Sequence, residues 1–413
     1  MAFFSSFVSV ASSDDRSHPG LTEERVIPLL LHGDEGAGPK KLPVLVVSVS
    51  CPLSRAESLN KKFPLIILPS KYLCKETWLE LQTVLSEGLN AAWHKRTRGY
   101  KSCFVGVKGD WKFHVQLFPS EGVSYTSDQI CLCCGASKTD PSLLSTDLSD
   151  SAGWLSSVLE EPRNPANLPP LSKAAGWSFF CYFMDLLHTI WLGIGRDAVG
   201  SFIVDILECS SSSETLATIF IDLGAYCDSN GIQHHLAGLT WSDIGVSSDF
   251  SYPHFKKSGY SCKVFLNYLA VKLQLVPGLE KQASCCWFLV EYQRVLDQAG
   301  SWLTEEEASS AVAAGQSFLD LWSDLAATNL EQGRCNYKIR PKHHNFSHFG
   351  VDRIRRGSRM NPRLTSCWLD EDFVGQICRA SRTCHSASLP LRMFHRHTLE
   401  LNRRFAQMER SRS

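Results

Sequence analysis

Short apolar runs separated by turn-forming residues dominate the first quarter of the chain. Residues 26–31, 42–50 and 63–68 are rich in Val, Ile and Leu and are bounded by Pro, Gly or Lys, which predicts three strands of a buried sheet. Residues 75–95 place apolar side chains near a 3.6-residue period and predict an amphipathic helix. A fourth strand is predicted over residues 102–107, so the chain is expected to belong to the α/β class.

Two aspartates follow the first and the fourth predicted strands. Asp34 stands in Leu-His-Gly-Asp-Glu-Gly, and Asp110 stands in Val-Lys-Gly-Asp-Trp. A three-stranded meander followed by a helix and a strand is the opening of an RNase H-like fold, in which the first and fourth strands are neighbours. Asp34 and Asp110 are therefore expected to converge and to bind hard divalent cations. Taken alone, each Gly-Asp pair is more typical of a turn, and Gly33 to Gly36 could simply close a hairpin.

The remainder of the chain divides by composition. Residues 1–24 are predicted to be disordered, residues 25–135 to form the first part of the core, and residues 136–175, rich in Ser, Pro and Asp, to form a linker with the Cys-x-x-Cys loop. Residues 176–335 are mostly helical in pattern and too long for a loop, which predicts a large α-helical insertion into the mixed sheet core. Residues 336–385 are expected to return to the core, and residues 386–413 to form a basic tail.

A two-metal site needs a third acid. A short helix predicted at residues 368–377 carries Asp370, Glu371 and Asp372 in its first turn, where acids also favour the helix dipole. Glu371 is the expected third carboxylate. Glu291, which follows an apolar helical run, is the alternative.

Cys131 and Cys134 have the spacing of half a zinc site. We expect His188 and His343 to complete it, and His344 and His348 are further candidates. Cys133 is a competing second thiol. Asp185 and His188 are three residues apart in an apolar helical stretch, which favours a joint structural or metal-binding role.

Composition fits an ordinary globular protein, with 44% hydrophobic residues, 20% charged residues and a net charge of zero. The charge is uneven, because residues 353–413 contain thirteen arginines, no lysine and five acids. Such a segment favours contact with phosphates, although a solvated tail is an equal alternative. The expected DNA contacts are Lys108, Lys112, Lys342, Arg355 and Arg356.

Sixteen scattered cysteines in a chain of this size predict buried thiols in a reducing compartment rather than a disulfide framework. The N-terminus lacks the basic region of a signal peptide, and no apolar run reaches the length of a membrane span. The protein is therefore expected to be soluble and intracellular.

The order of these motifs resembles the DDE transposases of the CACTA (En/Spm-like) group and related transposase-derived proteins of dinoflagellates. The resemblance covers roughly residues 25–380 and is carried by short motifs in sequence order, which are Asp34, Gly109-Asp110, Cys131-x-x-Cys134, Asp185-Leu-Leu-His188, Lys342-His343-His344 and Glu371-Asp-Phe-Val-Gly375.

The resemblance implies that Asp34, Asp110 and Glu371 hold Mg²⁺ or Mn²⁺ for DNA strand cleavage and transfer at transposon ends in the nucleus, with Zn²⁺ as a further metal. Asp372 stands where the family has an arginine, and a separate N-terminal DNA-recognition domain is not evident. These departures are expected of a truncated, decayed or domesticated copy. A catalytically dead nucleic-acid-binding or protein-binding relic and a zinc-stabilised helical scaffold are the alternatives, and the oligomeric state stays open.

Overall fold

The computed structural model describes residues 26–54, 61–95, 100–118, 122–162, 165–209, 214–248 and 250–410. The predicted disordered N-terminus, residues 1–24, lies outside them. The chain forms two compact units. We call Met1–Glu121, Leu159–Asp185 and Leu364–Ser413 the sheet unit, and Gly122–Val158 and Leu186–Arg363 the helical unit.

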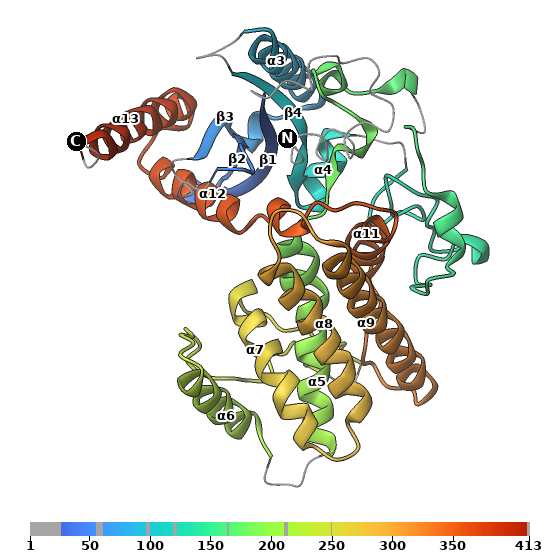
Figure 1. Ribbon diagram of the computed structural model, residues 1–413. Helices are drawn as coiled ribbons and strands as arrows, with labels where there is room; N and C mark the ends of the chain where they lie inside the picture. The colour runs from blue at the N-terminus through green and yellow to red at the C-terminus, as the bar shows by residue number, and fades with distance from the viewer. Residues whose placement is uncertain are drawn as a thin grey trace. The chain divides into compact units, whose positions relative to one another are not determined.

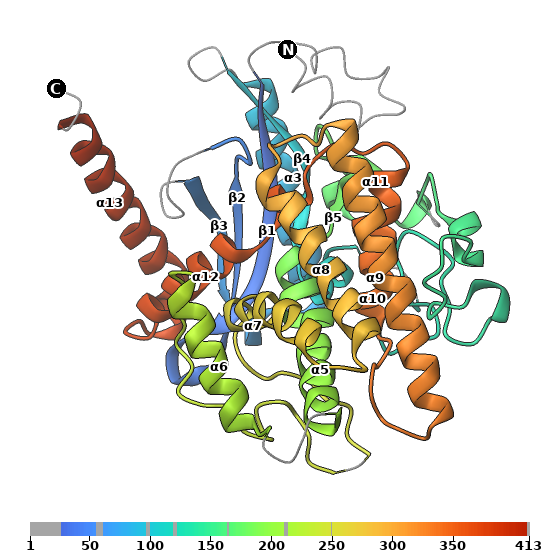
Figure 2. The same cartoon turned by 60° about the horizontal axis from the view of Figure 1, so that its bottom comes forward.

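The sheet unit is built on a five-stranded mixed sheet in the order β3-β2-β1-β4-β5 (Figures 1 and 2). Its strands are β1 (Val26–Ala37), β2 (Pro43–Ser50), β3 (Lys62–Pro69), β4 (Lys101–Gly109) and β5 (Tyr182–Phe183). β2 runs antiparallel to β1 and β3, whereas β4 runs parallel to β1 and β5. The predicted neighbourhood of the first and fourth strands is thus confirmed.

β1 is longer than its apolar run predicts. The strand continues past Leu31 to Ala37, and Asp34 is the register partner of Val46 on β2. The interpretation of Gly33 to Gly36 as a turn is therefore wrong. The reason is that β2 pairs with the polar half of β1 and extends it, so Asp34 lies inside the strand.

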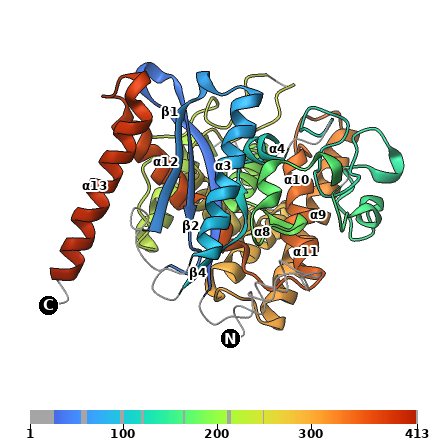
Figure 3. The same cartoon turned by 90° about the horizontal axis from the view of Figure 1, so that it is seen from above.

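Glycines on β1 let helices approach both faces of the sheet. A Cβ at Gly33 would collide with the ring of Phe113 on α4 (Trp111–Leu117), and one at Gly36 would lie 2.5 Å from Cys378 Sγ on α12 (Trp368–Ser381). Because side chains alternate along a strand, α4 and α12 cover opposite faces. Trp78 of α3 (Lys75–His94) contacts the Phe113 ring, so α3 lies on the α4 face (Figure 3).

The C-terminal segment is a helix over most of its length rather than a tail. α13 (Leu389–Arg410) packs against β3 and α12 through Leu389 and Met393, which are fully buried with Phe373 and Ile67 in one apolar cluster. Burial of one apolar face explains why this basic segment is ordered, and the exposed side of α13 carries arginines together with Leu391, Leu399 and Phe405.

The helical unit contains five long helices and three short helical segments that matter for the site. The long helices are α5 (Gly195–Cys209), α6 (Leu216–Ser229), α7 (Gly259–Lys272), α8 (Glu280–Gln298) and α9 (Glu305–Glu331). The short segments are α10 (Pro341–Asn345), the π-helical η10 (Phe346–Asp352) and α11 (Arg353–Arg355). Residues 122–158, predicted to be divided between core and linker, group with these helices instead.

No helix among the described residues is long and apolar enough to cross a membrane. All sixteen cysteines are free thiols, and most of them are buried. The chain therefore uses its cysteines as small apolar side chains or as ligands.

The close approach of Phe113 to β1 predicts opposite effects of two glycine substitutions. Gly33→Ala should lower the free energy of unfolding by about 1–3 kcal/mol, because the added methyl group overpacks a filled site. Gly88→Ala, at an open position of helix α3, should raise it by about 0.5–1 kcal/mol. Urea unfolding measures both, and equal effects would contradict the packing described here.

Candidate metal centre and acidic site

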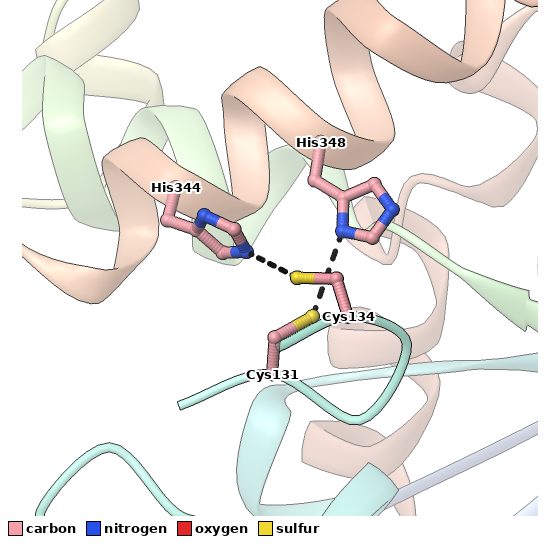
Figure 4. Close-up of side chains that lie close together, drawn as sticks. All are labelled: Cys131, Cys134, His344 and His348. Carbon is pink, nitrogen blue, oxygen red and sulfur yellow. Dashed lines mark hydrogen bonds between the residues drawn. The ribbon is translucent and has the colours of Figure 1, made fainter. Parts of the chain in front are cut away.

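Four buried side chains of the helical unit converge on one point (Figure 4). The ligand atoms of Cys131, Cys134, His344 and His348 all lie within 4.8 Å of one another. Cys131 Sγ lies 3.5 Å from His348 Nδ1, and Cys134 Sγ lies 3.4 Å from His344 Nε2. This Cys₂His₂ group could bind a metal such as zinc.

The two sulfur-to-nitrogen spacings match the edges of a zinc tetrahedron. With Zn–S near 2.3 Å and Zn–N near 2.05 Å, the sulfur-to-nitrogen edge of a tetrahedral site is about 3.6 Å. The two observed sulfur-to-nitrogen distances, 3.5 and 3.4 Å, are close to that edge. The arrangement therefore fits a closed, four-coordinate structural site.

Local structure explains how each ligand reaches the centre. The cysteines lie on a turn in which the Cys133 backbone N–H points at Cys131 Sγ at 3.4 Å. The histidines are four residues apart across α10 and η10, so they share a helix face. The fully buried Trp154 ring packs against both imidazoles, with centroids 4.4 Å from His344 and 5.3 Å from His348.

Protonation of the two thiols is unequal. Burial raises the pKa of Cys131, but contacts from Cys134, His348 and His344 outweigh burial and lower that pKa well below its ordinary value. Burial and the neighbouring Cys131 raise the pKa of Cys134 far above its ordinary value. Without a cation only one thiol ionises, whereas a divalent cation stabilises both thiolates.

The expected partners His188 and His343 are not members of this group. His343 is buried in a stack with Trp322, and its Nδ1 accepts a hydrogen bond from the Arg340 backbone N–H. His188 lies in the π-helical η8 (Leu187–Ile194). The two alternative candidates, His344 and His348, supply the ligands. The signal for them was their four-residue spacing on a helix.

The acidic residues of the sheet unit lie at neighbouring strand positions. Gly33 and Gly109 are register partners across the parallel strands β1 and β4, so the residues that follow them are Asp34 on β1 and Asp110 directly after the end of β4. Asp110 caps α4, and its Oδ1 accepts a 2.7 Å hydrogen bond from the Phe113 backbone N–H. Both aspartates are partly exposed, as carboxylates that meet a substrate must be.

Helix α12 runs alongside β1 in the direction of the strand. Near its start, Asp370 Oδ1 lies 3.8 Å from His32 Nδ1. Two turns later Cys378 packs against Gly36. The eight residues from Asp370 to Cys378 along the helix and the four residues from His32 to Gly36 along the strand both advance about 12–13 Å. The helix and the strand therefore run side by side over this length.

This direction puts Glu371 on the part of α12 that runs beside β1. Glu371 directly follows the residue that meets His32, so it lies beside the part of β1 between His32 and Gly36. It is partly exposed and precedes Cys378 by seven residues, which puts both on one helix face. Among the described residues, the carboxylates of Glu371, Asp34 and Asp110 do not all lie within 4.8 Å of one another, as the four ligand atoms of the Cys₂His₂ centre do. A shared cation would need these side chains to turn toward one another.

A lysine on α4 balances the acidic strand positions. Lys112 Nζ donates a 2.6 Å hydrogen bond to Glu35 Oε2. That hydrogen bond, together with the charges of Glu35, Asp110 and Asp34, raises the pKa of Lys112. Its side chain is 60% exposed, which is compatible with its predicted contact to a phosphate.

Lys108 is buried and ion-paired, so the prediction that it contacts DNA is wrong. Lys108 Nζ lies 2.6 Å from Asp370 Oδ2, and Lys62 Nζ contacts Asp370 Oδ1. Burial opposes ionisation of Asp370, yet electrostatic interactions with His32, Lys108 and Lys62 hold its pKa well below the usual range. Burial and Lys108 lower the pKa of Lys62 to about 8. This cluster ties α12 to the sheet.

Other predicted contacts have defined partners in the helical unit. Lys342 donates to the carbonyl oxygens of His188 and Leu192. Arg355 donates to Gln316, and Arg356 donates to Asp352 and to the Leu155 carbonyl. Both arginines stay exposed. The alternative third acid, Glu291, is ion-paired with Arg294 on α8.

Comparison with known proteins found no family model that matches the chain and no curated protein that matches it. Evidence for its function therefore comes from the side chains and distances described above.

The Cys₂His₂ geometry predicts one tightly bound zinc per chain. Cys131→Ser and His348→Ala should lose the metal and lower the melting temperature, because coordination energy contributes to folding. Cys133→Ser is the matched control, since Cys133 lies in the same turn but outside the ligand group, and it should keep the metal. Elemental analysis and thermal unfolding with and without a chelator measure the outcome. A Cys133→Ser variant that loses zinc while Cys131→Ser retains it would contradict this assignment.

Buried His32 predicts acid sensitivity. Burial lowers the pKa of His32 to about 4, so the folded state excludes a proton that the unfolded state binds below pH of about 6.5. Stability is therefore fully present above that pH and falls as the pH drops toward 4, by an amount on the order of 3 kcal/mol. His32→Asn should flatten this dependence in urea unfolding between about pH 7 and pH 4.5. Parallel curves for the two proteins would exclude His32 as the cause.

Proposed function

We propose that this protein is a transposase-like enzyme that cleaves and transfers DNA strands with the help of Mg²⁺ or Mn²⁺. The observation that carries the proposal is the pairing of Gly33 with Gly109, which puts Asp34 on β1 and Asp110 directly after the end of the adjacent parallel strand β4. The strand order and directions also support an RNase H-like core.

The position of α12 favours Glu371 as the third acid. The helix follows the long helical segment in sequence and puts Glu371 on its part that runs beside β1. Glu291 is the weaker candidate because its carboxylate is engaged by Arg294. Asp372 lies on the exposed side of α12 and accepts a hydrogen bond from Gln376.

The donor set fits hard divalent cations, since it consists of carboxylates that are partly exposed. Bound Mg²⁺ ions would lower the pKa of an attacking water or 3′-hydroxyl and stabilise the departing oxygen. Asp34, Asp110 and Glu371 would hold the ions, and Lys112 would offset phosphate charge beside them. A covalent protein intermediate is not required by this chemistry.

The Cys₂His₂ centre has a structural role in this proposal. It joins residues 122–158, which contain little regular structure, to α10 and η10. Zinc bound there would fix that segment without leaving an open coordination position for chemistry. The transposon-end target and the nuclear location remain predictions from the resemblance.

A second candidate is a relic that keeps the fold without catalysis. The observation in its favour is that, among the described residues, the carboxylates of Asp34, Asp110 and Glu371 do not lie as close to one another as the ligand atoms of the Cys₂His₂ centre. Such a relic would bind zinc but no second class of divalent ion.

A plasmid-nicking assay with Mn²⁺ or Mg²⁺ tests the enzymatic proposal. Asp34→Asn, Asp110→Asn and Glu371→Gln should each reduce the rate on the order of 100-fold or more, because each removes a metal ligand. Asp110→Asn keeps an acceptor for the α4 cap and so isolates the charge.

Two matched variants control for general loss of charge. Asp372→Asn and Glu291→Gln should nick at the wild-type rate. Full activity of Asp110→Asn would end the proposal, and loss in Glu291→Gln with activity in Glu371→Gln would move the third acid. A wild-type protein that neither nicks nor binds Mn²⁺ would favour the relic.

A further inference from the structure

Exposed arginines form a continuous row over the outer part of the sheet unit. We call Arg379, Arg382, Arg392, Arg396 and Arg403 the arginine track. Arg379 lies on the last turn of α12, Arg382 is the C-cap residue that follows it, and the other three lie on α13. All five are exposed, Arg403 with 65% of its side chain.

Hydrogen bonds join the two halves of the track. Arg396 Nη1 donates to the Ala380 carbonyl at 2.7 Å and to Thr383 Oγ1 at 3.0 Å, so its guanidinium group lies over the end of α12. Arg392, Arg396 and Arg403 are separated by four and seven residues, which puts them on one face of α13. The row therefore passes from one helix to the next without interruption.

The track concentrates positive charge in a protein whose net charge is zero. Residues 379–410 contain seven arginines, two glutamates and no lysine or aspartate, a surplus of five. Glu400 accepts hydrogen bonds from Arg403 and Arg404 and offsets part of it. Planar guanidinium groups bind phosphate oxygens in pairs, so a row of them fits a polyanion with regularly spaced phosphates.

The packing of α13 argues for a nucleic acid rather than a lipid surface. A membrane-bound amphipathic helix needs its main apolar face free, but Leu389 and Met393 are buried in the apolar cluster of the sheet unit and Leu401 is also buried, which leaves the separate side chains of Leu391, Leu399 and Phe405 exposed. Arg392 and Arg403 are eleven residues apart on α13, a rise of about 16 Å, which is the length of several phosphates along a DNA strand.

The inner end of the track points toward the acidic site. Gly375 and Arg379 follow Glu371 by four and eight residues and share its side of α12. A Cβ at Gly375 would lie 3.1 Å from Arg379 Nη1, so the absence of a side chain there lets the guanidinium group fold back along the helix. We infer that the arginine track binds the backbone phosphates of duplex DNA and leads a strand toward Glu371, Asp34 and Asp110. The inference rests on the proposed function for what happens to that strand.

Binding of the full chain to a duplex of about 20 base pairs, titrated with salt and without added divalent ions, tests the track. The triple variant Arg379→Gln/Arg382→Gln/Arg392→Gln should bind at least tenfold more weakly, and its slope of log K against log salt should fall by about 2.7. It spares Arg396, which caps α12. The matched control is Arg294→Gln/Arg359→Gln/Arg363→Gln, which removes three arginines that are ion-paired in the helical unit.

The control should change affinity less than threefold. Equally weakened DNA binding in both triple variants would overturn the inference, because the loss of affinity would then follow from the lower net charge and not from the position of the arginines. Binding of phosphatidylserine vesicles that depends on the track, with DNA binding unchanged, would overturn it in favour of a membrane. The Asp34→Asn/Asp110→Asn variant should bind DNA like wild type. A wild-type protein that binds DNA through the track but does not nick it would therefore reject the proposed catalysis and leave the DNA-binding inference standing. A track variant that nicks at the wild-type rate would reject the DNA-binding role of the track and leave the proposed catalysis standing.

Discussion

The buried ion cluster around Asp370 is the constraint on which the sheet unit depends. Lys62 comes from β3 and Lys108 from β4, so one carboxylate on α12 meets cations from two strands that are separated by β2 and β1 in the sheet. Burying these charges costs several kcal/mol per ion, and the pairs return that cost only in a single arrangement. A slip of α12 along the sheet would leave an unpaired buried charge. The cluster thus fixes the helix that carries Glu371 and begins the arginine track.

The helical unit solves a similar problem by different chemistry. Residues 122–158 have little regular structure and cannot align themselves by strand pairing or helix packing alone. Two thiols from this segment and two imidazoles from α10 and η10 meet beside a buried tryptophan, and a metal there would set their positions through short coordinate bonds. In both units a few polar contacts, buried within apolar surroundings, decide where a segment lies.

Zero net charge conceals a strong separation of charge. Asp34 and Asp110 occupy the positions after Gly33 and Gly109. Lys108, at the residue before Gly109, is buried and ion-paired. Arginines cover the end of α12 and the exposed face of α13. Composition averages over these three environments. Under the proposed function, a polyanion would meet the arginines first and the carboxylates only where divalent ions offset their charge.

Apolar periodicity in the sequence by itself determined the first four strands, helix α3 and the start of α12, because it reports local burial directly. The pairing of β1 with β4 was predicted from the order of these elements, which is that of an RNase H-like fold. The Cys-x-x-Cys spacing also identified half of the metal centre. Only the tertiary structure decided that His344 and His348 complete it, since four histidines were available and the choice depends on which helix face meets the cysteine turn. It also decided that Lys108 is a buried partner of Asp370 rather than a surface cation, because a lysine's role depends on a carboxylate 262 residues away in sequence.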